Sequence, residues 1–329
     1  MKVAGLWTAC GAAAMLCSGA AAESCAKSEV FAIAVHGGAF SEKNDGSKRL
    51  EAMKTALERA RASLKGGAAA LDAVQEVVTA FEDSGVFNAG KGAIANAAGQ
   101  VETDASIMDG KYMRSGAVAS MTRIKNPVAA ARLVMDAGRH VLVVGDRGQA
   151  YAESLGAQTA PVYYFWNTGH PKAVPAKQPD AKTPEHGTVG AVALDRCGHL
   201  AAATSTGGFD AKVPGRVGDS PLVGDGVYAA DDVAAFSGTG HGEYFIRYNV
   251  SKDAADRIRY ARQPLAKAMK AEIFEVLKPL KAEGGLIGID AKGHVGMYFN
   301  TLGMFRGYAT DKEEPVVAQY EGATEDKRK

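Results

Sequence analysis

The chain has 329 residues, of which 47% are hydrophobic and 23% are charged, proportions typical of a soluble globular protein. Its formal net charge is +1, and its basic residues gather only weakly, at positions 48–49 and at the C-terminus. This balance argues against nucleic acid or an anionic membrane surface as a partner. The length allows one large domain or two ordinary ones.

The first 22 residues have the pattern of a secretory signal peptide. Lys2 is followed by an alanine-rich apolar run that ends in three alanines just before Glu23. A positive start, a short apolar core and an Ala-x-Ala site predict cleavage after about Ala22, hence a periplasmic or secreted protein free of the membrane after signal removal. The alternative, a membrane anchor, fits less well because the run is short and contains polar residues; no later segment is long and apolar enough to span a bilayer.

Four cysteines are present, and two of them would leave with the signal peptide. Cys25 and Cys197 would remain, in an oxidising compartment. They can pair, but two cysteines define no disulfide framework, so the pairing stays open.

The first half of the chain alternates apolar and glycine-rich segments. We expect a buried strand over 30–35 that ends in a flexible turn at 36–39, and a glycine-rich loop at 87–92. Apolar spacing and turn residues predict helices over 50–64 and 70–81 and from Pro127, and strands over 93–97, 101–108, 117–121 and, buried, 141–144.

The second half opens with a proline-rich polar stretch, which we interpret as a flexible linker over 167–187. A buried strand follows from Thr188. It turns at 196–199, where Gly198 is free to take positive φ, and a second strand returns to the hydroxyl cluster at 204–206. Further elements are expected as strands within 227–236, 285–290, 294–299 and 304–308 and as helices from 244, over 254–261 and over 264–277.

These elements do not form a regular βαβ alternation. They predict two sheets stacked face to face with helices outside. Neither half has enough apolar strands to close a core alone, so the linker is not expected to separate two independent domains.

Common catalytic motifs are absent or incomplete. There is no Gly-x-Ser-x-Gly elbow, and the Gly-Asp-Ser sequence at 218–220 lacks the C-terminal Asp-x-x-His of the lipases that share it. The loop at 85–91 resembles a phosphate-binding loop, but Gly92 stands where Ser or Thr would hold magnesium. Residues 238–242 lack dinucleotide spacing, and the seven histidines show no zinc pattern. We therefore expect no metal ligand set and no required cofactor.

Thr188 can be activated if it becomes an N-terminal residue. A free α-amine has a pKa of about 7.7–8.0, close to the working pH of a general base. Cleavage after Gly187 would create it, since glycine tolerates a strained backbone at the end of the linker. Taken by itself, this interpretation is weaker than the ordinary one, in which Thr188 simply forms a strand.

Ordered blocks of sequence change that balance. The blocks are residues 36–39, 87–90, 108–110, 186–193, 204–208, 215–221 and 239–243. Together they resemble the plant-type L-asparaginases/isoaspartyl peptidases, which belong to the N-terminal nucleophile hydrolases. The resemblance covers about 29–310.

The resemblance implies a four-layer αββα sandwich with two mainly antiparallel sheets. It further implies self-cleavage before Thr188 into an α subunit, 23–187, and a β subunit, 188–329, that form one domain. A dimer of these αβ pairs is expected.

The resemblance also assigns roles to individual residues. Thr188 would cut the chain and then serve as the catalytic nucleophile, Thr206 would tune its hydroxyl, and Asn88 would support it. Thr239 and Gly240 would form the oxyanion hole. Substrate binding would fall to Arg216 on the α-carboxylate and to Asp219, with a carbonyl near Gly242, on the α-ammonium. Without the resemblance, Arg216 and Asp219 would be interpreted as a surface pair across a loop.

These groups would select L-asparagine and β-aspartyl peptides, small substrates from which L-aspartate is released. One rival is a glycosylasparaginase, a branch that usually has Asp at the position of Gly187 and Asn at that of Gly207. Another is a non-catalytic periplasmic amino-acid-binding protein, which would keep Arg216 and Asp219 and lose the threonines.

Two family features bear on the first half of the site. Phe40 replaces a glycine that the family usually has there, a change that bears on leaving-group preference. The family also often carries a structural sodium ion on backbone carbonyls, here expected around Glu82–Phe87.

Overall fold

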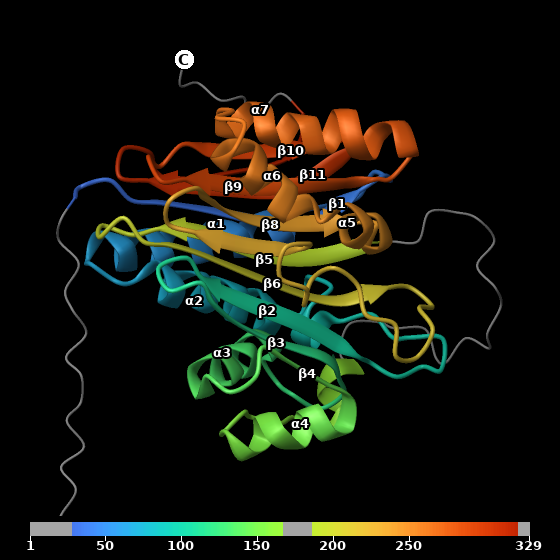
Figure 1. Cartoon of the computed structure of the whole chain (residues 1–329). Helices are drawn as coiled ribbons and strands as arrows, with labels where there is room; N and C mark the ends of the chain where they lie inside the picture. Colours follow the sequence, from blue (N-terminus) through green and yellow to red (C-terminus); the bar gives the residue numbers. More distant parts are fainter. Residues whose placement is uncertain (1–27, 167–185, 322–329) are drawn as a thin grey trace, which may run out of the picture.

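The computed structural model describes residues 28–166 and 186–321. Two β-sheets are stacked between two layers of helices (Figure 1). The expected αββα sandwich is confirmed. The predicted signal peptide, 1–22, and most of the predicted linker, at 167–185, lie outside the described residues.

The large sheet has the strand order β12-β11-β1-β5-β6-β2-β3-β4. Every neighbouring pair is antiparallel except β3 and β4. Its strands are β1 (Ala32–Phe40), β2 (Thr103–Asp109), β3 (Arg114–Met121), β4 (Leu142–Val144), β5 (His186–Leu194), β6 (Leu200–Phe209), β11 (Gly303–Thr310) and β12 (Val316–Tyr320). Strand β5, which carries Thr188, lies between β1 and β6 near the middle of the sheet.

The second sheet has the order β10-β9-β8-β7 and is wholly antiparallel. Its strands are β7 (Val227–Ala230), β8 (Ala234–Gly240), β9 (Gly284–Asp290) and β10 (Val295–Phe299). Side chains on the facing surfaces of the two sheets are small, for example Ala34 and Ala202. Small side chains let the two sheets pack closely, which brings the end of β8 to the start of β5.

Helices cover the outer faces. On the large sheet lie α1 (Ser47–Lys65), α2 (Ala70–Ser84), α3 (Pro127–Ala137) and α4 (Gly145–Ser154). With the small sheet lie α5 (Gly242–Tyr248), α6 (Val250–Arg259), α7 (Leu265–Lys270) and its π-helical continuation η3 (Ala271–Leu277). The period-two alternation of a strand divides its side chains between the layers: Ile33 and Val35 pack against the helices, whereas Ala32 and Ala34 face the other sheet.

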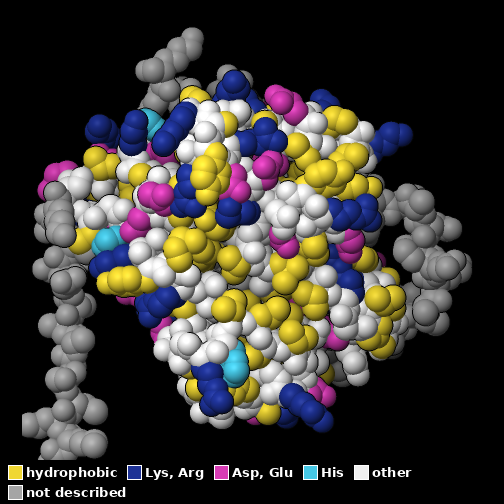
Figure 2. Space-filling model, viewed as in Figure 1, with side chains coloured by type: hydrophobic (Ala, Val, Ile, Leu, Met, Phe, Trp, Pro, Cys, Tyr) yellow, Lys and Arg dark blue, Asp and Glu magenta, His cyan; other side chains and the backbone are white. Residues whose placement is uncertain are grey.

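Several short elements complete the chain. They are the 3₁₀ turns η1 (Gly90–Gly92), η2 (Val162–Trp166) and η4 (Lys278–Leu280). Within the described residues, no helix has the length and apolar character needed to cross a membrane. On the face shown in Figure 2, basic and acidic side chains are interspersed with apolar ones.

The structure corrects some expected boundaries. The first strand does not end at His36 but continues to Phe40 through a bulge, because β11 pairs with it on both sides of the glycines. The strand expected over 93–97 is only an isolated bridge between Ala95 and Val101. The strand at 141–144 is reduced to β4 and is not buried, since it pairs with β3 alone at the sheet edge.

Other elements were not expected from the sequence, namely α4, β12 and the switch to π-helix at Ala271. The predicted hairpin is confirmed, and Gly198 has φ +81°. Strand β5 begins at His186, so the last two residues assigned to the linker already belong to the sheet. Cys197 is disulfide-bonded, and the three other cysteines lie outside the described residues.

Candidate active site

Thr188 lies directly opposite Thr206 in the β5–β6 ladder. Its side chain is buried, with 7% exposure, and its Oγ1 lies 3.2 Å from Thr206 Oγ1 as the donor of a hydrogen bond. Thr206 Oγ1 also accepts from the Gly208 amide at 2.9 Å. The hydroxyl of Thr206 must therefore direct its own proton elsewhere.

That proton goes to the carbonyl of Gly187. Thr206 Oγ1 donates to this oxygen at 2.8 Å, and Asn88 Nδ2 donates to it at 3.0 Å. The carbonyl next to Thr188 thus accepts two hydrogen bonds, which polarise it in the manner of an oxyanion hole. A continuous path of hydroxyl protons runs from Thr188 through Thr206 to Gly187.

Asn88 is itself fixed by the surrounding backbone. Its amide also donates to the Gly208 carbonyl at 2.6 Å, and its Oδ1 accepts from the Ile94 amide at 2.9 Å. A Cβ at position 187 would lie 2.7 Å from the Cβ of Asn88. Glycine at 187 is therefore required for this close approach.

His36 is a site residue that the sequence analysis did not assign. It is fully buried, with Nδ1 3.1 Å from the Thr188 carbonyl and Nε2 2.9 Å from Ser237 Oγ. Burial lowers the pKa of His36 to about 3, so the ring is neutral at ordinary pH. Because the Thr188 carbonyl can only accept, Nδ1 carries the proton and Nε2 accepts from Ser237.

Thr239 and Gly240 end strand β8 beside the glycine bulge of β1. The Ala39 amide donates to Thr239 Oγ1 at 3.3 Å, so the hydroxyl proton of Thr239 can point to another acceptor. Gly240 has φ +145°, and a Cβ there would lie 2.3 Å from the Glu283 carbonyl. A Cβ at Gly38 would lie 3.3 Å from the Thr188 nitrogen, which places this bulge against the Gly187–Thr188 peptide bond.

The three residues expected to hold substrate come together at one point. A Cβ at Gly242 would lie 2.7 Å from Asp219 Oδ1 and 2.9 Å from Arg216 Nη2. Arg216 forms its ion pair with Glu243, at 2.9 Å, and stacks 4.5 Å above the ring of Phe209. The ion-pair partner of Arg216 is therefore Glu243, and not Asp219 as the interpretation of a surface pair across the loop would require.

Asp219 is 5% exposed, and its Oδ2 has no hydrogen-bond partner among the described residues. Burial raises the pKa of Asp219 to about 7, although the nearby charge of Arg216 acts in the opposite direction. A cation that entered here would be favoured because it would stabilise the carboxylate.

A buried network supports the loop that carries Arg216. Lys212 is fully buried and donates from Nζ to the Glu102 carbonyl at 2.8 Å. The Glu102 carboxylate accepts from the Gly215 amide at 3.0 and 3.1 Å. Asp104 is also buried nearby; burial raises its pKa, and the charge of Lys212 opposes this. These contacts fix the backbone immediately before Arg216.

The predicted site residues therefore form two adjacent groups. Thr188, Thr206, Asn88 and Gly187 contact one another at the start of β5, with Thr239 and Gly240 linked to them through the β1 bulge. Arg216, Asp219 and Gly242 form the second group. In residues 28–166 and 186–321, no three His, Cys, Asp or Glu side chains gather in a way that could hold a metal ion.

The sandwich with Thr188 at the start of a central strand is that of the N-terminal nucleophile hydrolases. Residues 29–318 match the family model described as asparaginase, and the chain belongs to this family.

Three relatives illustrate the similarity. The chain is 40% identical to an isoaspartyl peptidase of Escherichia coli, over 89% of this chain and 97% of the relative. It is 41% identical to a plant-type L-asparaginase of Pyrobaculum calidifontis, over 85% and 97%. It is 38% identical to an isoaspartyl peptidase/L-asparaginase of Bos taurus, over 83% and 91%.

Proposed function

We propose that this protein is a self-activating hydrolase of β-aspartyl (isoaspartyl) peptides and L-asparagine that releases L-aspartate. The observation that carries the proposal is the hydrogen-bond path from the Thr188 hydroxyl through Thr206 to the Gly187 carbonyl. It joins a nucleophile, a proton carrier and a polarised carbonyl across the peptide bond that the family resemblance marks for cleavage.

Self-cleavage follows this path. Thr188 Oγ1 attacks the Gly187 carbonyl carbon and gives its proton to Thr206, which gives its own to the carbonyl oxygen. Asn88 stabilises the negative charge that builds up on that oxygen before the proton reaches it. The intermediate then collapses: its hydroxyl proton passes to the Thr188 nitrogen as the C–N bond breaks, which leaves an ester and the free α-amine of Thr188. Water hydrolyses the ester and frees the new C-terminus at Gly187.

The mature site uses the same hydroxyl again. The α-amine of Thr188 takes the hydroxyl proton, and Oγ1 attacks the β-carbonyl of the substrate. The Thr239 hydroxyl and the Gly240 amide stabilise the oxyanion. Ammonia or an amine leaves with the proton, and water releases L-aspartate from the acyl-enzyme.

Substrate recognition is assigned to the second group. The guanidinium of Arg216 binds the α-carboxylate through two parallel hydrogen bonds. Asp219 binds the α-ammonium, which compensates its buried charge. A free α-amino acid head held here presents its β-carbonyl, and not its α-carbonyl, to Thr188.

Assembly and location are proposed on the family resemblance and the N-terminal sequence. The chain is secreted or periplasmic after cleavage at about Ala22, becomes the subunits 23–187 and 188–329, and pairs as a dimer of αβ units. Thr188 is then the first residue of the β subunit.

A structural sodium ion is proposed for the loop over Glu82–Phe87 on the family resemblance, with backbone carbonyls of that loop as its ligands. The Phe87 carbonyl accepts one hydrogen bond, from the Ala89 amide, and keeps a second lone pair. The ion would hold the loop that ends in Asn88 and takes no part in the reaction.

The test is a denaturing gel of purified protein with N-terminal sequencing. Wild type gives two bands, one of which starts at Thr188, whereas Thr188→Ala stays a single chain without activity. Hydrolysis is measured on β-aspartyl-leucine, L-asparagine and a glycosylated asparagine, the last to test for a glycosylasparaginase. An active wild-type protein that remains one chain would refute the mechanism.

A further inference from the structure

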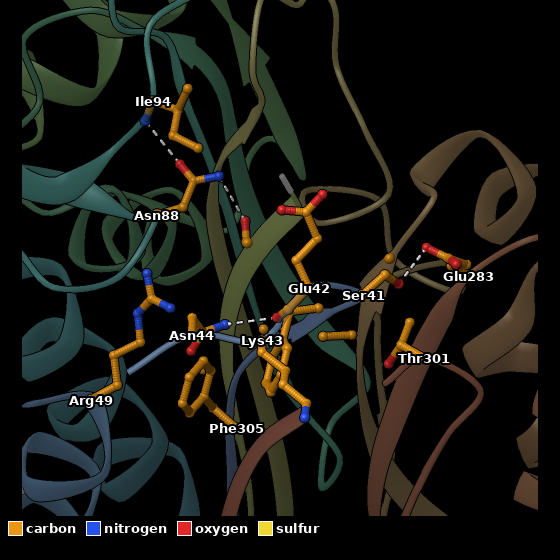
Figure 3. A pocket seen from close by; sticks show the side chains of 16 residues that line it. Ser41, Glu42, Lys43, Asn44, Arg49, Asn88, Ile94, Glu283, Thr301 and Phe305 are labelled. Carbon is orange, nitrogen blue, oxygen red and sulfur yellow. Dashed lines mark hydrogen bonds between the residues drawn. The ribbon is translucent and has the colours of Figure 1, made fainter. Parts of the chain in front are cut away.

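A pocket of about 980 Å³, measured with its open mouth, adjoins the proposed reaction centre (Figure 3). Asn88, Gly187 and Gly240 line it, so it reaches the bond that reacts. Arg216 and Asp219, which are assigned to the amino acid head, are not among the described residues that line it. The pocket therefore extends from the reacting carbonyl toward the leaving group.

Aromatic side chains form one wall of this pocket. The rings of Phe40 and Phe305 lie 4.9 Å apart between centroids, and Tyr320 meets Phe40 edge-on at 5.7 Å. Phe305 is 1% exposed, whereas Phe40 is half-buried and presents part of its ring to the pocket. Phe40 thus supplies an apolar contact surface that a glycine at this position would lack.

Two acidic and two basic residues line the pocket, namely Glu42, Glu283, Lys43 and Arg49. The Arg49 guanidinium lies 5.0 Å from the centre of the Phe305 ring, and its Nε donates to the Val86 carbonyl at 2.9 Å. Glu283 accepts from Ser41 Oγ at 2.7 Å. Figure 3 shows Arg49 and Glu283 on opposite sides of the pocket. A positive side next to an aromatic wall suits a group that carries both a carboxylate and an apolar side chain.

We infer that this pocket binds the leaving residue of β-aspartyl dipeptides that end in an apolar or aromatic amino acid. The leaving side chain packs on Phe40, which the buried Phe305 supports from behind, and its free α-carboxylate faces Arg49. Ammonia, the leaving group of L-asparagine, is too small to use these contacts. The inference rests on the proposed function and adds the class of peptide that the site prefers.

The aromatic wall is tested with two substrates on each enzyme. The ratio of kcat/KM for β-aspartyl-phenylalanine to that for β-aspartyl-glycine is measured in wild type and Phe40→Ala. We expect the ratio to fall about 5- to 10-fold in Phe40→Ala, because the apolar contact is lost. Phe40→Leu keeps most of the apolar volume and most of the ratio. A general loss of folded enzyme lowers kcat/KM for both substrates equally, so it leaves their ratio unchanged.

The carboxylate contact is tested with β-aspartyl-phenylalanine and its C-terminal amide. We expect wild type to prefer the free acid by about tenfold, as charge-assisted hydrogen bonds allow, and Arg49→Met to lose most of that preference. Lys54→Met, an exposed lysine on the same helix, is the matched control and keeps it.

The outcomes separate the two proposals. Unchanged ratios in variants that self-cleave and hydrolyse L-asparagine overturn the inference and leave the proposed function in place. A wild-type protein that neither cleaves before Thr188 nor hydrolyses L-asparagine overturns both.

Discussion

Thr206 Oγ1 donates to the carbonyl of Gly187 at 2.8 Å and accepts from Thr188 Oγ1 at 3.2 Å. The Thr206 hydroxyl therefore contacts both Thr188 Oγ1, the proposed nucleophile, and the Gly187 carbonyl, its proposed target in self-cleavage. This double contact makes Thr206 the most direct test of the self-cleavage path.

Thr206→Ala removes both contacts. We expect self-cleavage to slow by about 100-fold or more, the usual cost of removing one oxyanion donor. Thr206→Ser restores a hydroxyl and most of the rate. The precursor band is followed over time on a denaturing gel. Thr103→Ala is the matched control, because it removes another buried hydroxyl, one bonded to the Met121 carbonyl at 3.1 Å. Rapid cleavage of Thr206→Ala would exclude the path.

The raised pKa of Asp219, about 7, predicts an unusual pH profile. In the proposed mechanism, substrate binding needs the Asp219 carboxylate, and the Thr188 α-amine, for which a free α-amine pKa of about 7.7–8.0 is expected, must also be deprotonated. In the free enzyme both protons are lost as pH rises, so kcat/KM should fall with a two-proton slope below pH 7. In the complex the substrate ammonium keeps Asp219 ionised, so kcat falls with a one-proton slope.

Asp219→Asn provides the comparison for this profile. Its kcat/KM should fall with a one-proton slope as pH decreases, because only the Thr188 α-amine still titrates. Its KM should rise by about 100-fold because the substrate ammonium loses its buried partner. A one-proton slope of kcat/KM in wild type would contradict the assignment.

Lys212→Met tests the network beneath Arg216. The substitution leaves the buried Asp104 and Glu102 without their nearest cation, so we expect the free energy of unfolding to fall by about 3 kcal/mol. KM should rise about tenfold, with a smaller change in kcat, because Arg216, the proposed ligand of the substrate α-carboxylate, would no longer be held in place. Adding Asp104→Asn should restore part of the stability, measured by urea unfolding. Lys54→Met is the control at an exposed site.

Glu82 predicts a loss of stability with rising pH. It is fully buried, accepts from Ser205 Oγ at 2.7 Å, and has its pKa raised by burial from 4.5 to about 8. The unfolded chain loses this proton near its ordinary pKa, whereas the folded chain holds it to higher pH. The stability from Glu82 is therefore complete below about pH 4.5 and is lost as pH rises to about 8.

Glu82→Gln removes this titration. The difference in unfolding free energy between pH 5 and pH 8 should shrink by roughly 3 kcal/mol relative to wild type. Thermal or urea unfolding at the two pH values measures it. An identical pH dependence in both proteins would show that folding does not raise the pKa of Glu82, so that the group is already ionised in the folded state at pH 5.

The Thr188–Thr206 pair was accessible from the sequence because the hairpin is local. A short turn at Gly198 fixes the register of both strands, and regular pairing from Leu194 and Leu200 brings the two threonines opposite each other. The hydroxyl cluster and the glycine before Thr188 were visible in the same stretch. The roles of these residues in catalysis remain predictions.

His36 and Lys212 could not be assigned because their partners are distant in sequence. His36 contacts Ser237, 201 positions away, and Lys212 contacts Glu102, 110 positions away. Only the two glycines after His36 hinted at a close backbone approach. The burial of β4 was wrongly predicted and β12 was not predicted, for a related reason. Each is an edge strand that pairs with one neighbour, so its sequence lacks the apolar pattern of a buried strand.

The position of β5 between β1 and β6 has a consequence for the life of the protein after the cut. Both edges of this strand are hydrogen-bonded along the sheet, so the two fragments of the proposed cut would remain associated without a covalent link. Unfolding then releases two separate molecules, and refolding becomes a bimolecular reaction that depends on concentration. We therefore expect the uncut chain to refold more readily than the cleaved protein, whose two fragments would have to find each other after denaturation.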